Sequence, residues 1–222
     1  LHRRQRQMCI RDRLAAASAP KLRKSDRTRL AILDGALELL WSRPFRDLTV
    51  ADLMAVTGVS RSAYYRYFDD LYALMEALLL GLQEDIFAVA SPWFSDEGDP
   101  VESLRAGIAG QVRVCYQQGP ILRAVADAAT SDERLESAWA NFLIQFDDAV
   151  TATIEAQQAR GMIPPFDARP VAVALNRMDA SLLIHAFGRH PRQTPDLVLP
   201  AITRVWVSTL YPSSIPRPGF GS

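Results

Sequence analysis

The chain has 222 residues, of which 49% are apolar, and it carries 25 basic and 25 acidic residues. This size and composition predict a globular protein with a sizeable core and argue against a disordered chain. No run of about 18 apolar residues is present, so we expect no membrane span. Two cysteines, Cys9 and Cys115, are too few for a disulfide framework or a thiolate metal cluster, which fits a reducing cytoplasm.

Charge is divided unevenly along the chain. Residues 1–29 hold ten Lys and Arg against two Asp, which leaves 15 basic and 23 acidic residues beyond them. The first 14 residues match no folding pattern and carry no functional argument, and residues 1–20 are expected to be disordered or artefactual. A basic arm, of the kind that binds phosphates, is expected before the first helix, although a merely solvated end is the alternative. Its residues are Lys21, Arg23, Lys24, Arg27 and Arg29.

Three short helices are predicted in the first third of the chain. Apolar residues at helical spacing predict the first over residues 30–41. Thr49 and Asp52 have the spacing of a capping box that begins the second helix, and Gly58 can end it in a left-handed conformation. Ser60 is placed to cap the third helix. The second and third helices are therefore expected to be joined by a tight turn.

The third helix is expected to have an apolar back and an aromatic, basic front. Tyr64 and Phe68 share the back, whereas Ser62, Tyr65 and Arg66 share the front. Arginine can bind guanine with two hydrogen bonds, and hydroxyl groups and a helix N-terminus can hold phosphates. The alternative is a small bundle with half-buried tyrosines. The residues expected to contact DNA are Thr49, Ser60, Arg61, Ser62, Tyr65, Arg66 and Tyr67.

The rest of the chain is also predicted to be helical, and no strand-like alternation interrupts it. Helices are expected over residues 71–90, 101–118, 121–129, 131–159, 169–188 and 195–211. The breaks between them are expected at the proline- and glycine-containing stretches "SPWFSDEGDP", "QQGP", "RGMIPP" and "RHPRQTP". The fold class is therefore all-α.

The stretch "LTVADLMAVTGVSRSAYYRYF", followed by a long acidic helical body, resembles the TetR family of bacterial transcriptional regulators. The segments "ESAWANFLIQF", "LNRMDASLLIHAFG" and "ITRVWVSTLYP" are similar to one repressor of that family, so the likeness extends from about residue 30 to residue 211. It implies a helix-turn-helix DNA-binding domain over residues 21–69 and a ligand-binding and dimerisation domain over residues 70–211. Residues 212–222 are expected to be a disordered tail.

One position departs from the pattern of the family. The family usually has a lysine three residues after the aromatic that ends its third helix, whereas this chain has Leu71 there, preceded by Asp69 and Asp70. Because neutralisation of phosphates dominates affinity for DNA, a lost positive charge weakens binding. We therefore expect a weaker hold on the DNA backbone than is typical, or a greater role for the basic arm.

The resemblance implies a homodimer whose last long helices pack against their copies. The expected stripe on the final helix is Val198, Ala201, Ile202, Val205, Trp206 and Thr209. Internal packing of this stripe is the alternative. A two-fold dimer would present two reading helices to half-sites about 34–36 Å apart, or a multiple of that spacing, on double-stranded DNA.

The resemblance also implies an apolar, ligand-binding channel within the body. Its expected lining is Leu104, Gln111, Cys115, Trp139, Phe142, Phe146, Asn176, Asp179 and Trp206. Asn176 and Asp179 are its polar anchors, and a carboxylate only accepts hydrogen bonds, so a ligand amide N–H or an amine suits Asp179. Plain core packing for the aromatics and a solvated face for the anchors are the alternatives. Trp206 either closes one wall or lies at the dimer interface.

The expected function is a ligand-responsive, DNA-binding transcriptional regulator. A repressor released from its operator by a small hydrophobic or amphipathic effector is favoured, and activation is left open. His185 and His190 are not accompanied by a nucleophile motif, a glycine-rich phosphate loop or a metal-ligand set, so we expect no catalytic residue, no metal and no cofactor. The alternative is a helical small-molecule-binding protein with weakened or lost DNA binding.

Overall fold

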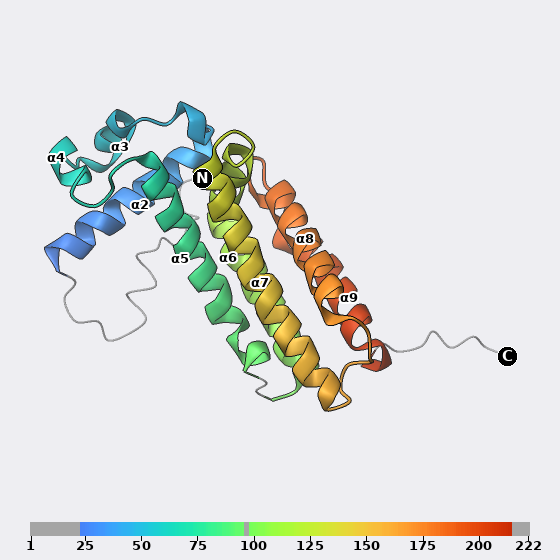
Figure 1. Cartoon of the computed structure of the whole chain (residues 1–222). Helices are drawn as coiled ribbons and strands as arrows, with labels where there is room; N and C mark the ends of the chain where they lie inside the picture. Colours follow the sequence, from blue (N-terminus) through green and yellow to red (C-terminus); the bar gives the residue numbers. More distant parts are fainter. Residues whose placement is uncertain (1–22, 96–97, 215–222) are drawn as a thin grey trace.

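The computed structural model describes residues 23–95 and 98–214, and this part of the chain is helical without a strand. Figure 1 shows a head, formed by α2 to α4, at one end of a helical body formed by α5 to α9. The head consists of α2 (Lys24–Ser42), η1 (Phe45–Asp47), α3 (Val50–Thr57) and α4 (Arg61–Tyr64). The body consists of α5 (Leu71–Phe94), α6 (Pro100–Ala128), α7 (Glu133–Ala159), α8 (Ala168–Phe187) and α9 (Pro195–Leu210), followed by η2 (Pro212–Ser214).

Local capping groups set the turn between α3 and α4, as the sequence predicts. The Thr49 backbone N–H donates to Asp52 Oδ2 at 2.9 Å, and the Asp52 backbone N–H donates to Thr49 Oγ1 at 3.2 Å, which is a complete capping box. Gly58 ends α3 with φ of +69°, and Ser60 Oγ accepts from the Ala63 backbone N–H at 3.3 Å. The hydrogen bond from the Thr49 side chain, more than the nearby Arg43, lowers the pKa of Asp52.

The first helix begins earlier than its apolar stripe predicts. α2 starts at Lys24 rather than at residue 30, so Arg27 and Arg29 lie on a helix and not in an arm. Lys and Arg are good helix formers, and an exposed helical extension leaves no apolar period to detect. The guanidinium of Arg29 lies 5.5 Å from the centre of the Phe68 ring, which joins this extension to the segment that follows α4. Lys21 and the expected disordered segment 1–20 lie outside the described residues.

The first break expected in the body falls within the predicted stretch but starts later than Pro92 suggests. α5 continues through Pro92 to Phe94. Proline removes one backbone donor, which in a helix would bond the carbonyl of Ala88 four residues earlier. The Ser91 hydroxyl donates to this same Ala88 oxygen at 3.0 Å, so the helix loses little. The expected tail is also wrong at its start, because residues 212–214 form η2, while residues 215–222 lie outside the described part.

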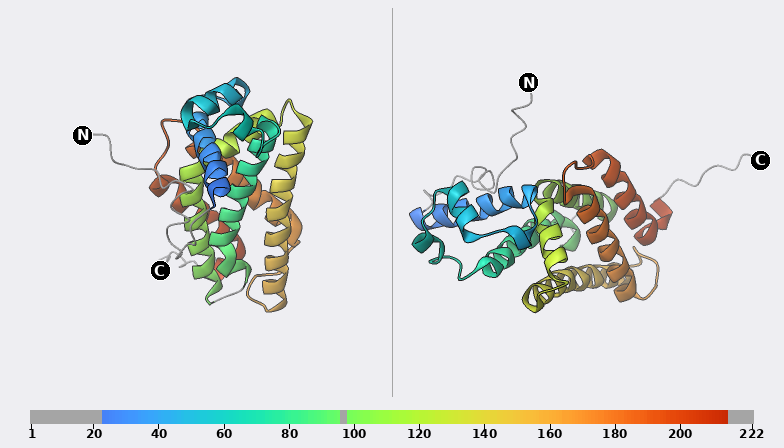
Figure 2. Two further views of the ribbon diagram at one scale, coloured as in Figure 1. Left: turned by 90° about the vertical axis from the view of Figure 1, so that its left-hand side faces the viewer. Right: turned by 90° about the horizontal axis from the view of Figure 1, so that it is seen from above.

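Helix α6 is the central helix of the body. It packs against α5, α7, α8 and α9, and it reaches the head through α2 and η1 (Figure 2). The two helices expected over 101–118 and 121–129 are segments of α6, separated by a kink at Gln118 with φ of −121° and ψ of 16°. Gly119 at this kink lies against α8, where an added Cβ would be 2.3 Å from the Phe187 carbonyl oxygen. The absence of a side chain at Gly119 therefore allows close packing of α6 on α8.

Within the described residues, no helix combines the length and the apolar character needed to cross a bilayer.

Candidate functional site

The third helix presents the polar front that the sequence predicts, on a shorter helix than expected. α4 contains four residues, and the backbone continues through a turn in which Arg66 and Tyr67 donate three residues back. Tyr64 is 1% exposed and Phe68 is 4% exposed, so both hold this segment on the core. The residues Arg61, Ser62, Tyr65 and Arg66, called the reading surface below, are exposed.

The reading surface is partly organised by contacts among its own side chains. The guanidinium of Arg61 lies 5.6 Å from the centre of the Tyr65 ring, and its Nη2 is 3.5 Å from the Tyr65 hydroxyl. The Ser60 and Ser62 hydroxyls are 3.2 Å apart. Of the other residues expected at DNA, Thr49 is exposed at the start of α3. Tyr67 is half-buried against the core, so less of its surface is free for a partner.

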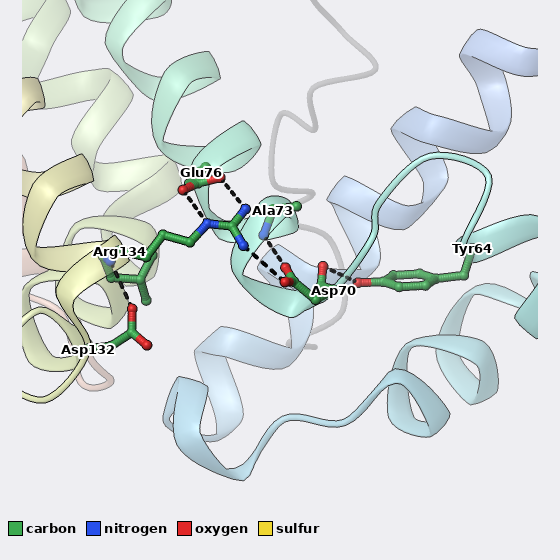
Figure 3. Close-up of polar contacts among 7 residues, drawn as sticks. Tyr64, Asp70, Ala73, Glu76, Asp132 and Arg134 are labelled. Atoms are coloured by element: carbon green, nitrogen blue, oxygen red, sulfur yellow. Dashed lines mark hydrogen bonds and ion pairs between the residues drawn. The ribbon is translucent and has the colours of Figure 1, made fainter.

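The reading surface is connected to the body through one arginine at the start of α7 (Figure 3). The Tyr64 hydroxyl donates to the Asp70 carbonyl oxygen at 3.0 Å. The Asp70 carboxylate caps α5 by accepting from the Ala73 backbone N–H at 2.7 Å, and it also accepts from Arg134 Nη1 at 2.9 Å. Arg134 binds Glu76 with two further bonds of 2.7 Å. Asp70 therefore joins α4, α5 and α7.

This arrangement changes what the acidic pair after α4 does. The hydrogen bonds from Arg134 to Glu76, and then the charges of Glu76 and Asp70, raise the pKa of Arg134. Asp70 therefore has a permanent cation beside it, and its charge is offset within the protein. Asp69 is exposed. The repulsion of DNA expected from this acidic pair therefore comes mainly from Asp69. The expected weaker hold on the DNA backbone stays a prediction.

A second contact between head and body is a stack of rings around Arg192. The guanidinium of Arg192 lies 4.7 Å from the centre of the Trp41 ring on α2 and 4.0 Å from the centre of the Tyr116 ring on α6. Arg192 Nη1 also donates to the Tyr116 carbonyl oxygen at 2.6 Å. His190 lies 4.8 Å from Trp41, centre to centre. The loop between α8 and α9 thus holds the last turn of α2.

The body contains two small adjoining cavities of about 40 Å3 each. Both are lined by Ile86, Gln111, Phe146, Asn176 and Asp179. Of the nine residues expected around a channel, these cavities bring together Leu104, Gln111, Cys115, Phe142, Phe146, Asn176, Asp179 and Trp206.

The two tryptophans of the expected lining differ in where they lie. Trp139 lines neither cavity and instead stacks on Phe142, with ring centres 5.4 Å apart. Trp206 is 4% exposed and forms a wall of one cavity, which places it inside the chain and not on its outer face. The stripe expected on α9 is therefore divided, with Val198 and Ile202 buried and Ala201 and Val205 exposed.

Polar groups within the cavities come from α6, α8 and α9. Trp206 Nε1 donates to Asp179 Oδ1 at 3.0 Å, and burial raises the pKa of Asp179 to about 7 although Trp206 and Gln111 act in the opposite direction. Asp179 Oδ2 has no hydrogen-bond partner. Asn176 Nδ2 donates to Asp147 Oδ1 at 2.9 Å. The side-chain carbonyl oxygen of Asn176 is therefore the group that can accept a hydrogen bond from a ligand.

Several residues of these sites are not found from the sequence. Trp93 and Phe94 line one cavity, and with Ile86 and Ala90 they have a helical spacing that the neighbouring proline obscures. A helical reading through "SPWF" would find them. The partners of Arg134 are 58 and 64 residues away along the chain, so no local pattern indicates the ion pairs.

Among residues 23–95 and 98–214, no group of three or more His, Cys, Asp or Glu is placed to hold a metal ion.

Two family models match the chain in the order of the head and the body. Residues 32–78 match the model for bacterial regulatory proteins of the TetR family, and residues 104–212 match the model for the C-terminal domain of the transcriptional regulator EthR. The chain belongs to the TetR family. The predicted family and the predicted all-α, helix-turn-helix fold are thereby confirmed. In this TetR-family protein, α2 to α4 are the helix-turn-helix head.

Curated relatives extend the likeness to most of the chain. The regulator EthR of Mycobacterium tuberculosis is 29% identical over 204 residues, which are 88% of this chain and 94% of the relative. EthR of Mycolicibacterium smegmatis is 28% identical over 188 residues, 82% of this chain and 85% of the relative. Among solved structures, GusR of Salmonella enterica has a TM-score of 0.69 at 18% identity, covering 86% of this chain and 99% of GusR. At that identity the structure supports the fold alone.

Proposed function

We propose that this TetR-family protein is a homodimeric repressor that binds a double-stranded DNA operator and leaves it when a small, mostly apolar effector enters the body. The observation that carries the proposal is the division of one short segment into two faces. Tyr64 and Phe68 are buried, while Arg61, Tyr65 and Arg66 are exposed on the other side. Such a surface suits the major groove, where arginine reads guanine and tyrosine hydroxyls reach phosphates.

The dimer is supported by apolar side chains left exposed on the last two helices. Leu182 on α8 and Val205 on α9 are each 39% exposed, and Leu197 on α9 is 69% exposed. Exposed apolar side chains on neighbouring helices favour association, and a two-fold axis is the usual arrangement. A two-fold dimer would carry two reading surfaces to successive half-sites of a duplex.

Control by an effector is supported by the position of the cavities. Their walls include α6 and α7. Helix α6 carries Tyr116, which contacts Arg192 beside Trp41 of the head, and α7 carries Arg134, which binds Asp70 next to the reading surface. A ligand that fits one arrangement of head and body better than the other shifts the population between them. A coupling of about 1–3 kcal/mol would change operator affinity roughly 5- to 150-fold. The proposal includes no catalytic step.

A binding protein that has lost its DNA-binding function is less well supported. The reading surface is exposed, and Asp70, one of the two acids that suggested such a loss, is paired with Arg134. The remaining acid, Asp69, does not cover that surface.

The test is a gel-shift experiment with the purified full-length protein and DNA from the region upstream of its own gene. We expect a retarded band that competitor DNA of unrelated sequence removes only at much higher concentration. Arg61→Ala together with Arg66→Ala should abolish the specific band, while the thermal unfolding midpoint stays near that of the wild type. Retention of the band by the folded double variant would contradict the role of the reading surface.

A further inference from the structure

Asp179 is buried in the body, and one of its carboxylate oxygens has no hydrogen-bond partner. The residue is 3% exposed, Trp206 donates to Oδ1, and Oδ2 has no hydrogen-bond partner. Burying an unpaired polar oxygen costs free energy, and the cost is larger for a charge. Asp179 lines both cavities, so a molecule that enters them meets this carboxyl group.

The cavities offer this carboxyl no countercharge. Each of the five body helices contributes to their walls, and no Lys, Arg or His is among the residues that line them. The residues that line a cavity together with Asp179 include Ile86 (α5), Gln111 and Cys115 (α6), Phe146 (α7), Asn176 (α8) and Trp206 (α9).

The neighbouring ionisable groups do not supply the missing positive charge. Arg177 is the cation next along α8, but it donates to both carboxylate oxygens of Asp147, at 3.2 and 2.9 Å. Burial, more than the nearby Asp179, raises the pKa of the Cys115 thiol, so this group stays neutral. For the same reason, desolvation, the pKa of Asp179 is raised to about 7.

An alkylammonium group supplies what this site lacks. It brings N–H donors for Oδ2 and a positive charge for the carboxylate, and the aromatic rings of Trp93, Phe146 and Trp206 on the walls favour a cation. The charges balance in either of two ways. An ammonium ion binds as Asp179 releases its proton to water, or a neutral amine accepts that proton within the site.

We propose that the effector is an amphipathic amine, whose cationic nitrogen binds Asp179 and whose apolar chain occupies the two adjoining cavities. The inference rests on the proposed effector pocket and narrows its ligand class. The cavities share Gln111 and Phe146, so these side chains must move apart for one elongated chain to occupy both.

The test compares three probes of equal chain length, n-octylamine, n-octanol and octanoate, by calorimetric titration into the full-length protein. At pH 8 we expect octylamine to bind at least tenfold more tightly than octanol and octanoate not to bind. As the pH falls below 7, binding of octylamine should weaken by about tenfold per unit, because Asp179 then holds a competing proton. Binding of octanol should change little. This comparison of probes uses the wild-type protein alone.

Asp179→Asn provides the second arm, with Asp148→Asn, an exposed residue on α7, as the matched control. The Asp179 variant should lose the preference for octylamine and its pH dependence, while the control keeps both. Equal binding of octylamine and octanol, no binding of octylamine, or a preference that survives in Asp179→Asn would each overturn the inference. Failure to bind the upstream DNA would contradict the repressor proposal and leave these binding results unaffected.

Discussion

The guanidinium of Arg134 lies 2.9 Å from Asp70 Oδ2, and this single contact joins the first turn of α7 to the turn that follows the reading surface. Both side chains are 44% exposed, so the pair is weak as a source of stability. Its position gives it another role, because the Asp70 carbonyl also holds the Tyr64 hydroxyl. Arg134 can therefore transmit the position of α7 to α4.

Replacement of Arg134 by alanine should consequently affect DNA binding more than folding. We expect the thermal unfolding midpoint to move little and the operator affinity to fall roughly 2- to 30-fold, the range of substitutions that act through other residues. Fluorescence anisotropy with labelled operator measures the affinity. Arg169→Ala is the control, since Arg169 makes a comparable exposed ion pair with Asp148 within the body. Equal losses in the two variants would argue against a special role for Arg134.

The stack around Arg192 predicts a different outcome, in which coupling is lost and DNA binding is kept. Arg192→Ala removes two cation–π contacts of about 0.5–2 kcal/mol each and frees the last turn of α2 from the loop after α8. We expect a lower free energy of unfolding and a smaller effect of effector on operator affinity. Chemical denaturation and operator titrations with and without effector test this. Arg192→Lys keeps the charge but not the planar group, so it should restore little of either property.

The helix-turn-helix turn was predictable because each of its determinants is local. Thr49 and Asp52 are three residues apart, Gly58 needs only its own backbone freedom, and the buried and exposed faces of α4 follow from side-chain spacing. The start of α2 and the end of α5 were not predictable from the same rules. An exposed extension has no apolar stripe, and the breaking effect of Pro92 is offset by a hydrogen bond from the neighbouring Ser91.

The contacts between head and body were hidden for a different reason. Arg192 and Tyr116 are 76 residues apart in the chain, and Arg134 is 64 residues from Asp70. Their pairing depends on how α6 and α7 pack, which no short pattern encodes. The cavity residues were found only because a family resemblance pointed to them, and apolar spacing alone would have assigned Phe142 and Phe146 to an ordinary core.

The salt dependence of operator binding tests which arginines of the reading surface contact phosphate and which contact bases. Loss of a base contact costs about 1–3 kcal/mol and relaxes the preference for one base, whereas loss of a phosphate contact lowers the salt slope by about one per contact. We expect Arg61→Ala to behave in the first way, because Arg61 lies at the start of α4. Arg105→Ala, in the first turns of α6, should change neither quantity. An unchanged affinity in Arg61→Ala would contradict the assignment.

The exposed apolar residues of α9 predict that one charge is enough to separate the dimer. Leu197→Glu would place a carboxylate in an apolar interface, where an unpaired charge costs several kcal/mol. Light scattering after gel filtration should show a monomer for this variant and a dimer for the wild type. Leu80→Glu is the control, since Leu80 is 55% exposed on α5, a helix on the opposite side of the body from α8 and α9 (Figure 1). A dimeric Leu197→Glu protein would place the interface elsewhere.

Asp179 also predicts how the stability of the ligand-free protein depends on pH. Its pKa is about 7 in the folded chain against 3.8 in the unfolded chain, so between these values the folded state holds a proton that the unfolded state has released. The free energy of unfolding therefore falls as the pH rises from about 4 to 7 and changes no further above 7. The total loss is on the order of 2–4 kcal/mol. Asp179→Asn should remove this part of the pH dependence and be more stable than the wild type at pH 8, with the difference shrinking towards pH 5. If the free energies of unfolding of the two proteins instead changed with pH in the same way across this range, Asp179 would have an ordinary pKa.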